Sequence, residues 1–139
     1  MTTLTRNHDI LTAEVKAHIE ADALVRGEYW DGSKGCFIGC LTHSSDPKPA
    51  FERFGLPEPL MRIAESIFEE LPDEDGRAFF AALPDAVGCD GKDLTRVHWA
   101  FLASELRLLP RQDGIDTVIA GMDLLAAGRE WPARAARAA

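Results

Sequence analysis

The sequence predicts an all-α protein: a single compact domain of about five to six helices, with a central helix near residues 94–109. Three observations support this fold class. Apolar residues recur at the three- and four-residue spacing of amphipathic helices over most of the chain. No convincing strand pair, repeat of constant period or heptad register is present. A chain of 139 residues is also the usual size of one domain, and it can bury a core without metal or disulfides.

The first third of the chain predicts a helix, a turn and a second, short helix. The first helix is expected over residues 12–25, and Gly27 ends it. Its apolar side consists of residues at helical spacing, namely Leu11, Val15, Ile19 and Ala23. The following segment GEYWDGSKG, residues 27–35, has the glycines and the Asp-Gly pair that favour turns. A short helix is then expected over 36–42.

The middle of the chain predicts a loop and two helices. Pro47 and Pro49 indicate a loop without regular helix over residues 44–55. Pro57 and Pro59 suit the first turn of a helix that reaches Leu71. We expect its buried stripe to be Leu60, Ile63, Ala64, Ile67 and Leu71. A short helix over 76–83 follows, and Pro84 limits it.

The last third predicts two longer helices. Asp93 suits the N-cap of the helix over 94–109, which is apolar on two sides and is therefore expected to be surrounded by others. The next helix is expected over 115–127 and ends at Gly128. The tail 129–139 is rich in alanine and arginine, and we expect it to be a frayed helical end or disordered.

Composition narrows the classes of function. The net charge of −8 disfavours binding to nucleic acid and to anionic membranes, because both repel an acidic chain. No apolar run approaches the length of a membrane span, and the polar start Met1–Asp9 does not resemble a signal peptide. Three cysteines, an odd number, indicate free thiols in a reducing compartment. We therefore expect a cytoplasmic, acidic protein.

The segment Gly35–His43 contains the side chains best suited to catalysis or ligand binding, two cysteines and a histidine. In a helix, Cys36, Cys40 and His43 would share one face. Cys36 stands at the expected helix start next to Lys34, where a thiolate would be favoured. This arrangement is open to three interpretations: a reactive thiol, a metal site or plain packing. The turn before it adds two aromatic residues to the candidate thiol or ligand site, Tyr29 and Trp30.

Metal and cofactor motifs in this segment are incomplete. Structural zinc sites usually contain C-x2-C pairs, and iron–sulfur clusters usually need four cysteines. The spacing of Cys36, Cys40 and His43 matches neither pattern. The turn over 32–35 is neither a P-loop nor a dinucleotide fingerprint. The sequence therefore predicts no metal centre and no cofactor, although a metal or a small ligand stays open as an alternative.

A second candidate surface is a run of carboxylates without a basic residue. Such a concentration of negative charge can meet a basic partner protein, or it can be only a solvated helix face. The candidate acidic interaction face consists of Glu65, Glu69, Glu70, Asp73, Glu74 and Asp75.

Three segments together resemble a group of small bacterial and bacteriophage proteins that has no known activity. They are GSKGCFIGC (32–40), FGLPEPL (54–60) and IFEELP (67–72). The group is similar in a GKGCxxGC-like turn and an IFExLP-like helix end, and Ser33 departs from the glycine expected near Lys34. The resemblance implies a bacterial or mobile-element origin and carries no catalytic residue across.

These observations lead to two hypotheses. The first is a non-enzymatic binding or regulatory protein that acts through a protein partner, as a monomer or a homodimer. Its basis is a full-sized core, an acidic surface and the lack of any complete catalytic motif, including a nucleophile elbow or an H-E-x-x-H pair. The alternative is a thiol-dependent redox protein, or a protein that binds a small ligand or metal, centred on Cys36, Cys40 and His43. This alternative predicts that Cys36 is alkylated faster than Cys40 or Cys89.

Overall fold

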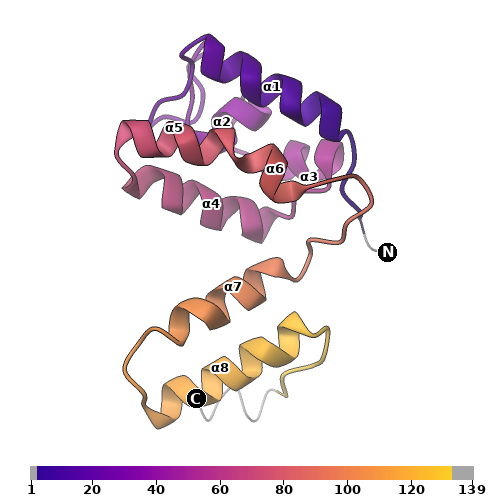
Figure 1. Ribbon diagram of the computed structural model, residues 1–139, viewed down its shortest axis with the longest axis vertical. Helices are drawn as coiled ribbons and strands as arrows, with labels where there is room; N and C mark the ends of the chain where they lie inside the picture. The colour runs from indigo at the N-terminus through magenta and orange to yellow at the C-terminus, as the bar shows by residue number, and fades with distance from the viewer. Residues whose placement is uncertain (1–2, 133–139) are drawn as a thin grey trace. The chain divides into compact units, whose positions relative to one another are not determined.

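The computed structural model describes residues 3–132, and within that range the chain is all-α, as the sequence predicts (Figure 1). The contacts group the chain into two compact units where the sequence predicts a single domain: Met1–Leu94 (unit 1) and Thr95–Ala139 (unit 2). Unit 1 contains α1 (His8–Glu20), α2 (Phe37–Thr42), α3 (Lys48–Phe54), α4 (Glu58–Glu70), α5 (Asp73–Ala81) and α6 (Leu83–Val87). Unit 2 contains α7 (Val97–Leu106) and α8 (Asp113–Ala126).

Two short helices were not expected from the sequence. The prediction of an irregular loop over 44–55 is wrong because α3 forms there, with Pro49 in its first turn. In the same way α6 begins just before Pro84, where that proline was expected to end a helix. A proline in the first turn lacks only an N–H group that would have no partner inside the helix. The residue type therefore permits a helix start as readily as a stop.

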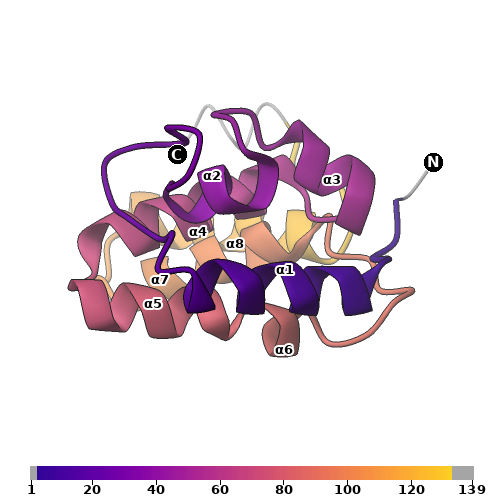
Figure 2. The same ribbon diagram turned by 90° about the horizontal axis from the view of Figure 1, so that it is seen from above.

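Helix α2 lies at the centre of unit 1. It contacts α1, α3 and α4. Figure 1 shows it between α1 and α4, and Figure 2 shows it beside α3. The side chains of Phe37, Ile38, Cys40 and Leu41 are all buried. Phe37 meets three further rings, with centroid distances of 6.3 Å to Phe68, 5.6 Å to Phe79 and 5.3 Å to Phe80. An apolar helix with only six residues is stable here because its neighbours remove it from water.

Helix α4 buries a different stripe from the expected one. Its buried residues are Met61, Glu65 and Phe68, while Ile63 and Ile67 are only partly buried. The spacing of the buried residues is still that of one helix face. The buried face is rotated by about one residue from the expected one because it includes Glu65, a carboxylate, which the pattern places on the solvent side.

The beginning of the described chain is held by Thr5, a buried polar residue. Its backbone N–H donates to the carbonyl of Lys92 at 2.7 Å, and its hydroxyl donates to the carbonyl of Cys89 at 2.8 Å. The N–H of Gly91 in turn donates to the carbonyl of Thr5 at 2.7 Å. These bonds join the first residues of unit 1 to its last loop, so the polar groups of both segments are satisfied.

In unit 2, α7 and α8 form an antiparallel pair (Figure 1). Helix α7 lies inside the predicted segment 94–109, and its N-cap is Arg96, where the sequence suggested Asp93. Gly121 on α8 packs under the indole of Trp131, because a Cβ atom there would lie 2.1 Å from that ring. Most of the predicted tail, residues 133–139, lies outside the described residues. No helix within residues 3–132 is long and apolar enough to cross a bilayer.

Candidate functional site

The turn before α2 packs on two glycines, Gly35 and Gly39, which are together called the glycine notch below. The carbonyl oxygen of Tyr29 lies against Gly35 and Gly39 so closely that an added Cβ would be 2.0 Å and 1.3 Å from it, respectively. The N–H of Cys36 donates to the carbonyl of Glu28 at 2.7 Å. The two glycines thus allow the turn to pack directly on the start of α2. This contact places Cys36 beneath residues 27–29.

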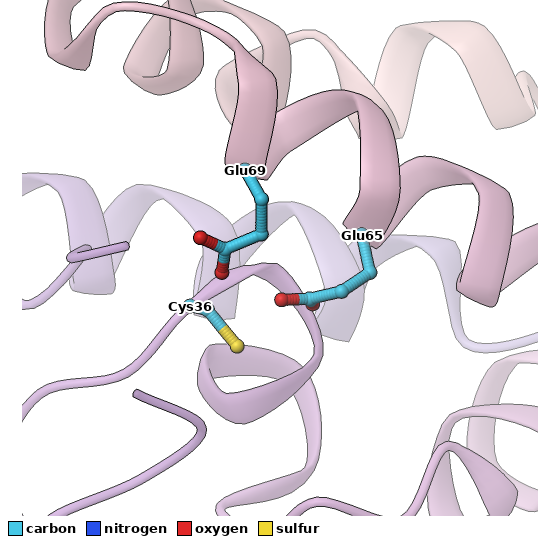
Figure 3. A group of neighbouring side chains, drawn as sticks. All are labelled: Cys36, Glu65 and Glu69. Atoms are coloured by element: carbon cyan, nitrogen blue, oxygen red, sulfur yellow. The ribbon is translucent and has the colours of Figure 1, made fainter. Parts of the chain in front are cut away.

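Two carboxylates of α4 reach the thiol of Cys36. Glu65 and Glu69 are one helical turn apart and therefore share a face of α4. Figure 3 shows both carboxylates extending from α4 toward the sulfur. The sulfur and a carboxylate oxygen from each glutamate all lie within 4.8 Å of one another. This side-chain group, Cys36 with Glu65 and Glu69, is called the Cys–Glu–Glu cluster below.

Backbone N–H groups hold both carboxylates in place. Glu65 accepts a hydrogen bond of 2.7 Å from the N–H of Ile38, in the first turn of α2, so a residue of α4 caps that helix. Glu69 accepts from the N–H of Gly27 with both oxygens, at 3.1 and 2.9 Å. These bonds pre-orient the two carboxylates toward the thiol and join three segments of unit 1.

The electrostatics of the cluster favour protons in the absence of another cation. Burial, and after it the hydrogen bond from the thiol to Glu65, raises the pKa of the Cys36 thiol to about 12. Burial also raises the pKa of Glu65 above its ordinary value, and the neighbouring Glu69 carboxylate adds to the rise. Like charges held together in a poorly hydrated site favour neutral forms. The cluster therefore favours the binding of protons or of another cation.

The cluster borders a cavity of about 220 Å³. Its other walls are Gly27, Glu28 and Tyr29, from the turn that the glycine notch positions. The cavity is large enough for several water molecules or an ion with its remaining ligands. A small guest could therefore reach the sulfur from this side.

The other residues of the predicted thiol site lie elsewhere. Cys36 has an extended backbone as the N-cap of α2, and His43 has a left-handed backbone as its C-cap, so the three residues do not share one helical face. The buried thiol of Cys40 points to backbone carbonyls, donating to Gly35 at 3.3 Å, and burial raises its pKa to about 12. Lys34 is exposed at the turn.

His43 belongs to an aromatic group on the other side of α2. Its ring stacks on Trp30 with a centroid distance of 3.9 Å and an interplanar angle of 1°. Its Nε2 atom lies 3.1 Å from the Nε2 atom of His18 on α1. Burial lowers the pKa of His43, and the neighbouring His18 lowers it further. His43 thus anchors the turn through Trp30 and does not serve the Cys36 thiol.

The acidic run divides into residues with different roles. Glu65 is buried and Glu69 is half-buried, and both belong to the Cys–Glu–Glu cluster. Asp73 forms an ion pair of 3.0 Å with Arg26. The members of the run outside the cluster are all exposed: Glu70, Asp73, Glu74 and Asp75.

Sequence reasoning missed that Glu65 and Glu69 belong with Cys36. One signal was available: Glu65 lies at the helical spacing of Met61 and Phe68, which are both apolar. A carboxylate within an apolar stripe indicates a buried partner. Tertiary packing decides which group that partner is, because the hydrogen bond from the N–H of Ile38 to Glu65 links residues that are 27 positions apart.

No protein-family model, curated protein or solved structure matches the chain.

The burial of the thiols predicts an order of alkylation opposite to the one that the reactive-thiol hypothesis requires. Cys89 is exposed, whereas Cys36 and Cys40 are each 1% exposed with raised pKa values. We expect iodoacetamide to label Cys89 at least about 100-fold faster than the other two at pH 7.5, since thiolate and access both limit the rate. Peptide mass spectrometry over time measures this, with denatured protein as the control. Fastest labelling at Cys36 would restore the reactive-thiol hypothesis.

Proposed function

We propose that this protein binds a divalent transition-metal ion, with Zn²⁺ as the best fit, at the Cys–Glu–Glu cluster. The observation that carries the proposal is the convergence of one sulfur and two carboxylate groups within 4.8 Å, beside a cavity. In a tetrahedral zinc site, sulfur and oxygen ligands lie about 3.5 Å apart. The side chains therefore need to move inward by about 1 Å, which small changes in side-chain torsion supply.

The donor set favours a particular class of metal. A thiolate is a soft ligand that suits Zn²⁺ and related transition metals, and it disfavours Mg²⁺ and Ca²⁺. Two carboxylates and one thiolate bring three negative charges, which a divalent cation largely neutralises. The hydrogen bonds from Ile38 and Gly27 orient the carboxylates as outer-shell partners do in metal sites. Three protein ligands leave one position toward the cavity.

The expected protein partner has less support from the arrangement of the chain. That hypothesis relied on a continuous acidic face, and two of its members, Glu65 and Glu69, point inward to Cys36. A third, Asp73, is paired with Arg26. The exposed members of the face are then Glu70, Glu74, Asp75 and the ion-paired Asp73, and small acidic groups of this kind are common on solvated surfaces. Partner binding stays a hypothesis, second to metal binding.

The decisive experiment is a metal titration of the purified full chain. Co²⁺ serves as a probe, because coordination by Cys36 gives a thiolate-to-cobalt charge-transfer band, and Zn²⁺ should displace it at one ion per chain. We expect Cys36→Ser to abolish the band, and Glu69→Gln to weaken binding by at least about 10-fold, since each removes a donor or its charge. Cys89→Ser is the matched control, because it removes an exposed thiol and should leave the titration unchanged.

Two outcomes would reject metal binding at the Cys–Glu–Glu cluster. One is a titration without a saturable charge-transfer band at micromolar Co²⁺, or with a band that Zn²⁺ does not displace. The other is a band lost in Cys89→Ser and kept in Cys36→Ser, which would assign the metal to the exposed thiol. Far-UV circular dichroism and thermal melts of each variant show that the fold is intact. In either case the cluster would act only as an anchor between α2 and α4.

The metal affinity should rise with pH. The Cys36 thiol, with its pKa near 12, must lose its proton before the sulfur can bind the metal. Each displaced proton contributes about a tenfold increase in affinity per pH unit below that pKa. We therefore expect Zn²⁺ affinity, measured by competition with a chelator of known pH behaviour, to rise at least about tenfold between pH 6.5 and 7.5. An affinity independent of pH would contradict thiolate ligation.

A further inference from the structure

A second, larger cavity in unit 1 has a different chemistry. Its volume is about 430 Å³, within the range of small-molecule sites. It shares no lining residue with the cavity of the Cys–Glu–Glu cluster. Its lining combines an apolar part, formed by Leu24, Val25 and Phe68, with charged side chains from the turn and from α5. This space is called the cationic pocket below.

The charges of the cationic pocket are unusual for so acidic a chain. Three cationic side chains line it, Arg26, Lys34 and Arg77, against two carboxylates, Asp22 and Asp73. The whole chain carries a net charge of −8. A positive concavity on such a surface attracts a small anion against the overall field, because walls of low dielectric concentrate the local potential.

The two ion pairs at the pocket leave N–H donors of both arginines free to bind a ligand. Arg26 uses its Nε atom for Asp73 at 3.0 Å, and Arg77 uses one Nη atom for Asp22 at 2.6 Å. Each guanidinium keeps further N–H donors. The carboxylates are the more exposed partners, at 88% and 70% against 41% and 52% for the arginines. Water therefore screens the negative charges more than the positive ones.

Lys34 supplies a cation without a fixed partner. Within residues 3–132 its ammonium forms no ion pair inside 4.0 Å. Its backbone is held firmly, since its N–H donates to Asp31 at 2.7 Å and Asp31 also accepts from Ser33. The turn thus presents a lysine at the pocket on a pre-organised backbone, which lowers the entropic cost of binding.

We propose that the cationic pocket binds a small organic anion, a carboxylate or a phosphate monoester with a compact apolar body. The anionic group would pair with Lys34 and with free N–H donors of Arg26 and Arg77. The apolar body would lie on Leu24 and Phe68. This inference is independent of metal binding, because the two sites use different residues and different ligands.

The test follows backbone amide signals of ¹⁵N-labelled protein while phenyl phosphate is added. We expect saturable shifts confined to residues 22–26, 34 and 73–77, with a dissociation constant of about 0.1–1 mM for so small a ligand. Benzoate should bind the same residues. Inorganic phosphate lacks the apolar body, and benzyl alcohol lacks the charge, so both should bind at least about fivefold more weakly. A chelator in the buffer keeps any metal effect out of the measurement.

Variants of Lys34 test the charge of the pocket, and a variant of Lys16 is the control. Lys34→Gln removes a cation without a structural bond and should weaken phenyl phosphate binding by about 5- to 10-fold, whereas Lys34→Arg should retain it. Lys16→Gln removes an exposed cation on α1, outside the pocket, and should change nothing. The proposal is overturned by the lack of saturable shifts at about 10 mM ligand, or by equal losses in Lys34→Gln and Lys16→Gln. Benzyl alcohol binding as tightly as phenyl phosphate would also overturn it.

Discussion

Gly39→Ala should strongly destabilise unit 1. A Cβ atom at this position would lie 1.3 Å from the carbonyl oxygen of Tyr29 and 2.3 Å from its carbonyl carbon. Both atoms belong to the backbone, so no rotation of a side chain relieves the overlap. Alanine improves helix propensity over glycine by only about 1 kcal/mol. The overlap costs more, and we expect a loss of at least about 3 kcal/mol, at the upper end of measured overpacking effects.

Thermal unfolding followed by far-UV circular dichroism measures this loss. A change of 3 kcal/mol lowers the melting temperature by more than about 10 °C in a unit of this size. Gly32→Ala is the matched control, because Gly32 has a φ of 103° and no atom within 4 Å of an added Cβ. That variant should lose only about 1 kcal/mol, from backbone strain. Equal melting temperatures for the two variants would contradict the glycine notch.

Glu65→Ala should destabilise unit 1 by about 2–4 kcal/mol. The substitution leaves the buried N–H of Ile38 without its acceptor, which costs about 1–3 kcal/mol, and it opens a cavity beside Cys36. Glu65→Gln is the informative comparison. Its amide oxygen still accepts from Ile38, and it carries no charge to desolvate. Urea unfolding in the presence of a chelator should therefore place Glu65→Gln near wild type and Glu65→Ala well below both.

The same three proteins should differ in their pH dependence. Burial raises the pKa of Glu65 above 4.5, so the folded state keeps a proton that the unfolded state releases. The stabilising contribution of this proton is complete below pH 4.5 and is lost as the pH rises through the folded-state pKa. Wild type should thus lose stability relative to Glu65→Gln between pH 5 and pH 7.5. A constant difference across this range would mean that Glu65 is already ionised in the folded protein.

Some elements could be predicted because their signals are local. The helix predicted up to Leu71 is present as α4, and the helix predicted over 115–127 is present as α8, because helical periodicity is repeated over several turns in each. The two short helices α3 and α6 were missed for an equally local reason. Pro49 and Pro84 stand in their first turns, where proline carries no information on whether a helix starts or stops.

The candidate site was predictable only in part. The glycine-rich turn and Cys36 stand out in the sequence as a place where the backbone bends before a buried helix. Their partners do not, because Glu65 looked like one of several solvated carboxylates. The expected grouping of Cys36 with His43 assumed a helix through both residues. Both are caps of α2 with non-helical backbones, so the rule for residues on one helix face does not apply to them.

The sequence by itself determined the helical class, the position of the longer helices and the turn that leads to Cys36, because each depends on residues close together in the chain. The tertiary structure alone decided which side chains meet. It joined Cys36 to Glu65 and Glu69 of α4, left Cys40 and His43 outside this cluster, and brought Lys34 near the two arginines of the cationic pocket. These groupings depend on how α2 packs among its neighbours, and the glycine notch at Gly35 and Gly39 controls that packing at the turn. Close packing between distant segments is a property of the whole core, which no short stretch of sequence contains.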